Sequence, residues 1–205
     1  MSREVFEIVQ GMDRHSIETQ LALQCAPLIA GLKVSNLLIV SKQNEKLVRE
    51  ILRNSGIMCY RLLLDREKVT LLLFRRAELE FLLKKREIRE VLAKNSYNSF
   101  SLGYVLCTFR ERYEKHRKGG REFPHEMGLL LGYPVEDVVG FIEHQGKEYL
   151  YAGYWKVYAN LPEKISLFAK YEAAKEAMIY LVSSGVGMRE IIEIYEDEMQ
   201  QKAAV

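Results

Sequence analysis

Residues 57–74 read IMCYRLLLDREKVTLLLF, two apolar runs of strand length separated by a polar turn. The turn is Asp65-Arg66-Glu67, and the runs span residues 57–64 and 68–74. Because so short a connection joins antiparallel neighbours, the segment predicts a β-hairpin. The hairpin therefore supplies two strands of a small sheet.

The sequence around this hairpin predicts two more strands and several helices. Residues 36–40 form another apolar run of strand length, and residues 147–158 read as a strand that bends or bulges near Gly153. Helical spacing of apolar residues occurs over 13–24, 43–54, 77–93, 100–117, 162–183 and 188–200. Without a regular βαβ alternation, the expected class is α+β, a small, mostly antiparallel sheet of about four strands flanked by several helices.

Length and composition describe an ordinary globular chain. With 205 residues, 48% of them hydrophobic, the chain suits a single α+β domain over residues 1–185 and an acidic C-terminal helix over 186–205 that packs on it or extends from it. The formal net charge of +2 gives no global field for nucleic acid.

One basic segment could still bind phosphate. Residues 110–121 carry six Lys or Arg side chains and His116. Only Tyr113 and His116 among them have rings that could stack on bases, and basic residues at the end of a helix complement its dipole. We therefore do not expect nucleic-acid binding.

Three cysteines and the N-terminal sequence indicate a cytoplasmic protein. Cys25, Cys59 and Cys107 are far apart and odd in number, which fits a reducing compartment. The N-terminus has charges where a signal peptide needs an apolar core, and no apolar run approaches the roughly 20 residues that span a bilayer. We expect no membrane association.

Most chemical motifs are absent. His125-Glu126 resembles the start of a zinc-protease helix, but position 129 is Leu where the second histidine is needed. Gly185-Val-Gly-Met-Arg-Glu lacks the third glycine of a dinucleotide fingerprint. No P-loop or nucleophile elbow is present, so the sequence predicts no metal ligand set and names no cofactor.

The segment Glu122–Gly132 is the first part of a candidate site. If Pro124 is the first helical residue, His125 and Glu126 lie in the first turn, where the helix dipole favours neutral imidazole and a charged carboxylate. His125 would then act as an acid, a base or a ligand, and Glu126 would orient it. The alternative is structural, with Glu126 capping the helix and His125 packing on Tyr133 or Phe123.

The segment Gly153–Tyr158 is the second part. Tyr154, Trp155 and Lys156, together with Tyr133, form a candidate binding wall for a small planar ligand or an anion. The alternative is that the aromatic residues serve only as ordinary strand formers.

Cys25 is the third candidate. It precedes Pro27, and a helix break there would place its thiol at a helix N-terminus, lower its pKa and make it a nucleophile. The alternative is a buried packing residue, the commoner role of a free cysteine. Cys59 and Cys107 lie in apolar patterns and are expected to react slowly.

Three blocks also resemble a known family. They are residues 25–36 (CAPLIAGLKVSN), residues 122–142 (EFPHEMGLLLGYPVEDVVGFI) and residues 153–158 (GYWKVY). They resemble the uncharacterised bacterial family called domain of unknown function 3793, over roughly residues 10–185. The resemblance implies a bacterial, cytoplasmic protein and supplies no mechanism.

Three functions remain open from the sequence. The first is binding of a small molecule or cofactor, with or without catalysis, at the two segments above. The second is a non-catalytic protein-interaction module with the acidic C-terminal helix as its partner surface. The third is nucleic-acid binding through residues 110–121, which the sequence favours less than the first two.

Overall fold

The computed structural model describes residues 2–120 and 122–203, and the chain divides into two compact units. Unit 1 comprises Met1–Phe74 and Ala169–Val205, and unit 2 comprises Arg75–Phe168. The expected single domain over residues 1–185 stays a prediction, because it concerns folding as one cooperative body.

Unit 1 contains the three-stranded sheet. Its strands are β1 (Ser35–Ser41), β2 (Ile57–Leu64) and β3 (Lys68–Arg75), in the order β1-β3-β2. β1 and β3 are antiparallel, with Leu38 opposite Leu71. At the turn between β2 and β3, the Asp65 N–H donates to the Lys68 carbonyl at 2.9 Å. The hairpin predicted over residues 57–74 is confirmed.

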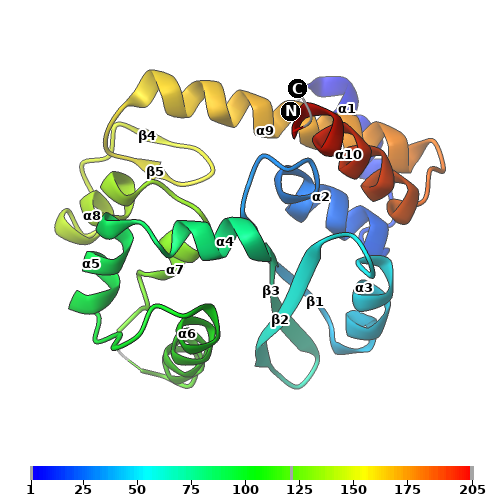
Figure 1. The fold of residues 1–205 in the computed structure, drawn as a ribbon. Helices are drawn as coiled ribbons and strands as arrows, with labels where there is room; N and C mark the ends of the chain where they lie inside the picture. The colour runs from blue at the N-terminus through cyan, green and yellow to red at the C-terminus, as the bar shows by residue number, and fades with distance from the viewer. Residues whose placement is uncertain (1, 121, 204–205) are drawn as a thin grey trace. The chain divides into compact units, whose positions relative to one another are not determined.

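Helices cover one face of this sheet. They are α1 (Arg3–Gly11), α2 (Ile17–Ile29), the short 3-10 helix η1 (Lys42–Asn44), α3 (Glu45–Ile51), the later part of α9 (Leu161–Ser183) and α10 (Met188–Ala203). The helix α2 packs against β1 and against α10 (Figure 1). The core between these layers is aliphatic and includes Val5, Leu21, Leu28, Leu38, Val69, Leu71, Leu73, Ile179 and Ile191.

The predicted helix break at Pro27 is wrong. The helix α2 continues through Pro27 to Ile29, and Gly31, with φ of +68°, follows its end. The missing N–H of proline removes one helical hydrogen bond. Burial of the surrounding apolar residues outweighs that loss, since Cys25, Ala26 and Leu28 are fully buried.

Unit 2 is built mainly from helices. They are α4 (Arg76–Leu82), α5 (Arg86–Lys94), α6 (Leu102–Arg117), α7 (Met127–Leu130), α8 (Val135–Glu143) and the first residues of α9. The single helix predicted over 77–93 is therefore two helices. The buried side chains of the unit include Leu79, Leu83, Ile88, Leu92, Val105, Phe109, Leu129, Leu130 and Val157.

The strand predicted over residues 147–158 folds back on itself and does not join the other sheet. It forms a separate antiparallel pair, β4 (Tyr151–Ala152) and β5 (Lys156–Val157). The turn is closed by the Gly153 N–H, which donates to the Trp155 carbonyl at 3.0 Å. A Cβ at Gly153 would lie 2.5 Å from the ring of Phe168, so close packing requires glycine here. The α+β class is confirmed, with its strands in two sheets.

Candidate functional site

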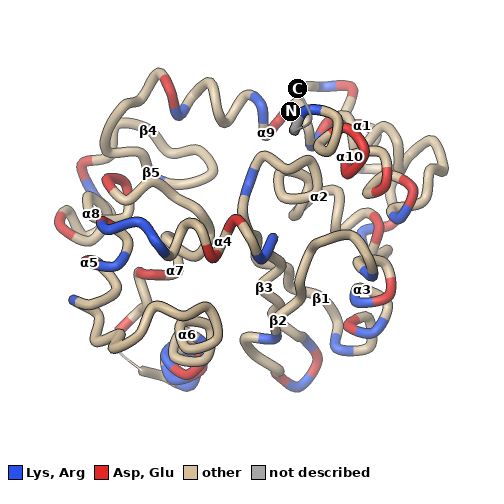
Figure 2. The backbone as a smooth tube through the Cα atoms, viewed as in Figure 1, with Lys and Arg blue, Asp and Glu red and all other residues tan. Residues whose placement is uncertain are grey.

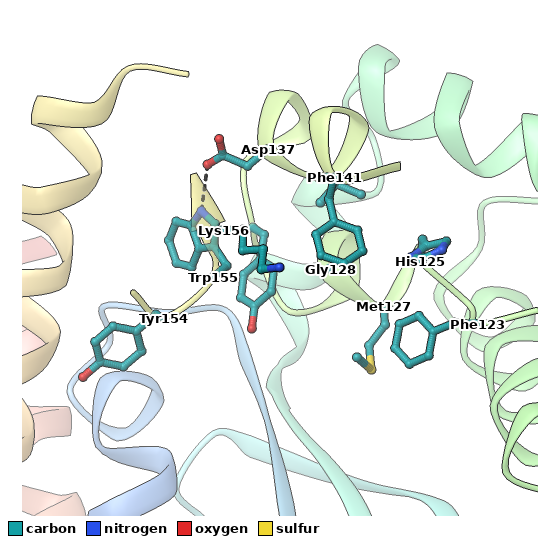
Figure 3. Close-up of a pocket in the computed structure, with 11 residues that line it drawn as sticks. Phe123, His125, Met127, Gly128, Asp137, Phe141, Tyr154, Trp155 and Lys156 are labelled. Carbon is teal, nitrogen blue, oxygen red and sulfur yellow. Dashed lines mark hydrogen bonds between the residues drawn. The ribbon is translucent and has the colours of Figure 1, made fainter. Parts of the chain in front are cut away.

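Unit 2 encloses a pocket of about 320 Å³ (Figure 3). Three short stretches of chain, within residues 123–128, 133–141 and 154–156, supply its walls. Its lining is mostly aromatic and aliphatic and consists of Phe123, His125, Met127, Gly128, Tyr133, Asp137, Val138, Phe141, Tyr154, Trp155 and Lys156.

Asp137, in the first turn of α8, holds the walls together. One oxygen, Oδ2, accepts a hydrogen bond from the indole Nε1–H of Trp155 at 2.7 Å. The other, Oδ1, accepts from the backbone N–H groups of Tyr158 at 2.7 Å and Ala159 at 3.2 Å. The Asp137 side chain is buried, so these three donors replace water around its charge. Asp137 thereby fixes the β4–β5 hairpin to α8.

Trp155 is the centre of an aromatic cluster. Its ring stacks on Tyr133 at 4.8 Å between centroids, with 25° between the ring planes. Phe168 of α9 meets it nearly edge-on, at 4.6 Å and 84°. Trp155 is only 8% exposed, so its ring forms a fixed wall of the pocket.

A glycine brings α7 and α8 together beside the pocket. A Cβ at Gly128 would lie 2.8 Å from Cγ2 of Val138 and 3.3 Å from the ring of Tyr133. Any larger residue would push these helices apart. Gly128 therefore keeps two lining side chains in place.

Lys156 is the cationic group of the pocket. Its Nζ donates to the carbonyl of Gly146 at 2.6 Å. The ammonium lies 4.7 Å from the ring centroid of Tyr149 and 5.8 Å from that of Phe141. Figure 3 shows its nitrogen pointing away from Trp155 and toward Phe141. The predicted wall residue is thus held by one hydrogen bond and two cation–π contacts.

His125 lines the pocket, and its ring packs between two phenyl rings. The centroid distances are 5.3 Å to Phe123 and 5.5 Å to Phe141. Burial lowers the pKa of His125, and the nearby charge of Glu126 partly opposes this effect. This direction agrees with the predicted preference for neutral imidazole. The predicted cause was a helix N-terminus, and it does not hold, because helix α7 begins only at Met127 and has four residues.

Glu126 is not among the residues that line the pocket. Its side chain is fully buried, and Oε1 accepts hydrogen bonds from the Tyr97 hydroxyl at 3.0 Å and from Nε of Arg112 at 2.5 Å. It makes no side-chain cap to α7 either, so the predicted Glu126 cap is wrong, whereas the predicted packing of His125 on Phe123 is confirmed. Glu126 instead anchors the segment that carries His125 to α6.

Cys25 belongs to the core of unit 1 and has no part in the pocket of unit 2. Its side chain is fully buried, and burial raises its pKa to about 12, with Lys33 and Asn36 lowering it in part. The prediction of a helix-terminal, activated thiol is wrong because α2 does not break. Cys107, predicted to be inert, is exposed, because it lies on α6 opposite the buried Val105 and Phe109.

Basic and acidic residues are mixed on α6 (Figure 2). Arg112 pairs with Glu126, and Lys118 lies 3.7 Å from Glu114. Arg121, the last residue of the basic segment, lies outside the described residues. Nucleic-acid binding here stays untested, and the expectation against it stays a prediction.

Sequence reasoning missed Asp137 and part of the pocket lining. Phe123, Met127, Val138 and Phe141 lie within the block of residues 122–142 that was singled out, yet none of them was predicted to line a site. A usable signal did exist for Asp137. The chain has one tryptophan, a buried indole N–H needs an acceptor, and Asp137 is an acid in the first turn of a helix.

The described residues contain neither a group of side chains that could hold a metal ion nor a helix that could span a membrane. Within residues 2–120 and 122–203, no three His, Cys, Asp or Glu side chains are grouped so that they could hold a metal ion. None of the helices in that part of the chain combines the length and apolar character needed to cross a lipid bilayer.

The chain belongs to the family described as Protein of unknown function (DUF3793), whose model matches residues 21–192. The resemblance noted from the three sequence blocks is therefore confirmed. No curated protein and no solved structure matches the chain.

Proposed function

We propose that unit 2 binds a small, planar, largely apolar organic molecule. The observation that carries this proposal is the pocket of about 320 Å³ with aromatic walls from three separate stretches of chain. Its volume lies within the range of about 300–1,000 Å³ that is typical of small-molecule sites.

The shape of the ligand follows from the walls. Phe141, Tyr133 and Trp155 offer ring faces and edges, which favour a flat partner through stacked or edge-to-face contacts. The polar side chains are few, namely His125, Asp137 and Lys156, together with the Tyr133 and Tyr154 hydroxyl groups. Few polar groups in an apolar pocket orient a ligand, whereas the apolar area supplies most of its affinity.

Pre-organisation supports the proposal further. Trp155 is held by Asp137 and by Tyr133, so its ring does not need to be ordered when a ligand enters. A wall that is already ordered avoids roughly 0.5–1.5 kcal/mol for each side chain that would otherwise be immobilised.

The test is a binding screen against one- and two-ring aromatic compounds, by ligand-observed NMR and then calorimetry. We expect some compounds to bind with one-to-one stoichiometry. The variant Met127→Trp adds bulk to the pocket lining and should abolish their binding. As a matched control, Ile165→Trp places the same side chain at an exposed position outside the pocket and should leave binding unchanged.

Two results would contradict the proposal. One is that no compound binds to the folded protein. The other is that compounds bind Met127→Trp as tightly as they bind the natural sequence, which would place them elsewhere on the chain.

A further inference from the structure

Lys156 carries a charge that no acidic side chain neutralises. Among the residues that the structure describes, no carboxylate lies within ion-pair distance of its Nζ, and it is the one Lys or Arg side chain in the pocket lining. Lys156 is half-buried, where an unneutralised ammonium attracts an anion more strongly than it would in open water.

The contacts of Lys156 leave donor capacity unused. An ammonium group has three N–H donors, and the Gly146 carbonyl accepts one of them at 2.6 Å. The rings of Tyr149 and Phe141 stabilise the positive charge but accept no conventional hydrogen bond. The remaining donors suit a group with two acceptor oxygens.

The loop that holds Lys156 has an unusual backbone. Gln145, Gly146 and Glu148 have φ values of +52°, +72° and +56°. Two of these residues are not glycine, and such conformations cost free energy and persist where the surrounding structure imposes them. Here they present the Gly146 carbonyl to Lys156 and so fix the ammonium in one position.

Asp137, the acidic side chain in the lining, does not compete for this ammonium. Both of its oxygens are occupied by N–H donors, one by Trp155 and the other by two backbone groups. Asp137 thus has a structural role in the pocket, whereas Lys156 keeps hydrogen-bond donors that a ligand could use.

We infer that the ligand is a planar aromatic acid, whose ring lies among Phe141, Met127 and Trp155 and whose anionic group binds the ammonium of Lys156. This inference rests on the proposed function and narrows its ligand class. The hydrogen bonds between an ammonium and a carboxylate are roughly twice as strong as neutral ones, so the acid should be preferred over its uncharged amide.

The test compares 2-naphthoate with 2-naphthamide, which share one ring system and differ in charge. By calorimetry we expect the acid to bind the natural sequence at least about tenfold more tightly than the amide. Lys156→Met should remove this preference by weakening only the acid. Lys147→Met, which removes an exposed lysine of the same loop, should retain it.

The outcomes separate the two proposals. If the amide binds the natural sequence as tightly as the acid, the inference about the acid is overturned and the planar-ligand proposal stands. If neither probe binds but other one- or two-ring compounds of the screen do, the inference about the acid is overturned and the planar-ligand proposal stands. If none of these compounds binds, both are contradicted. The comparison within the natural sequence needs no variant, so a folding defect in Lys156→Met cannot conceal the answer.

Discussion

Replacing Asp137 by alanine should loosen the pocket and destabilise unit 2. The change removes the acceptor for three hydrogen bonds, from the Trp155 indole and from the backbone N–H groups of Tyr158 and Ala159. It also removes the carboxylate oxygen that accepts from the indole N–H of Trp155, a residue only 8% exposed. The hairpin would then lose its attachment to α8.

The size of the effect follows from these contacts. A hydrogen bond to a charged group contributes about 1.5–3 kcal/mol, and a buried donor left unsatisfied costs about 1–3 kcal/mol. The two backbone donors are only partly buried and can turn to water, and removing a buried charge recovers some desolvation energy. We therefore expect Asp137→Ala to lower the free energy of unfolding by about 3–5 kcal/mol.

The assay is urea unfolding followed by tryptophan fluorescence. Because Trp155 is the one tryptophan of the chain, its emission reports on unit 2, whereas circular dichroism reports on all helices. The emission of folded Asp137→Ala should shift to longer wavelength as water reaches the indole. Glu143→Ala, at an exposed acid of the same helix, is the control and should change stability by no more than about 0.5 kcal/mol.

A loss below about 1 kcal/mol with an unchanged emission maximum would refute the reasoning, because it would mean that Asp137 does not hold Trp155. Asp137→Asn should have a stability between those of the natural sequence and Asp137→Ala, since an amide keeps one oxygen acceptor but places an N–H donor opposite other donors.

The same data test the single-domain prediction for residues 1–185. Coincident fluorescence and dichroism transitions are expected for one cooperative domain, and separate transitions would contradict it.

Three further predictions concern single groups. Burial lowers the pKa of His125, and Glu126 partly opposes this effect, so the unfolded chain binds this proton at a higher pH than the folded chain does. The free energy of unfolding should therefore fall as the pH drops below about 6.5. In urea titrations, His125→Asn should lose this pH-dependent part of the stability. Alkylation by iodoacetamide at pH 8, followed by peptide mass spectrometry, should modify the exposed Cys107 first and then Cys59, whose pKa burial raises to about 11. Cys25 should react on the order of 1,000-fold more slowly than Cys107. Equal rates for the three cysteines would contradict the placement of Cys25 in the core. Glu126→Gln should lower the free energy of unfolding by about 2–3 kcal/mol, which is less than the loss for a fully buried ion pair because the partner Arg112 is partly exposed. An unchanged urea midpoint would exclude the anchoring role of Glu126.

Local patterns predicted the elements whose causes are local. The hairpin at 57–74 follows from two apolar runs and a polar turn, and α9 follows from helical spacing that begins near Pro162. The fold class followed from the same patterns. In these segments the residues that decide the structure are neighbours in the sequence.

The errors occur where distant residues decide the outcome. The sequence predicted only a bend near Gly153, whereas the close packing that requires glycine there involves the ring of Phe168, fifteen positions further along the chain. Asp137 reaches donors 18 to 22 residues away, and Glu126 reaches Tyr97 at a separation of 29. Periodicity carries no information about such pairs, so the His125–Glu126 prediction depended on a helix start at Pro124, whereas α7 begins at Met127.

The crowding of special residues at 122–126 has an architectural explanation. Phe123 and His125 line the aromatic pocket, whereas Glu122 and Pro124 line a second, more polar cavity of about 300 Å³. Side chains of an extended segment alternate between its two sides, and the buried Glu126 anchors the end of this one. The segment therefore needs apolar, rigid and charged residues in quick succession to build two surfaces. Packing of His125 and anchoring by Glu126 explain why these two residues stand here, and a catalytic role for them stays a prediction. Under the proposed function, the choice of ligand then depends on the few polar groups that packing leaves available, Lys156 above all.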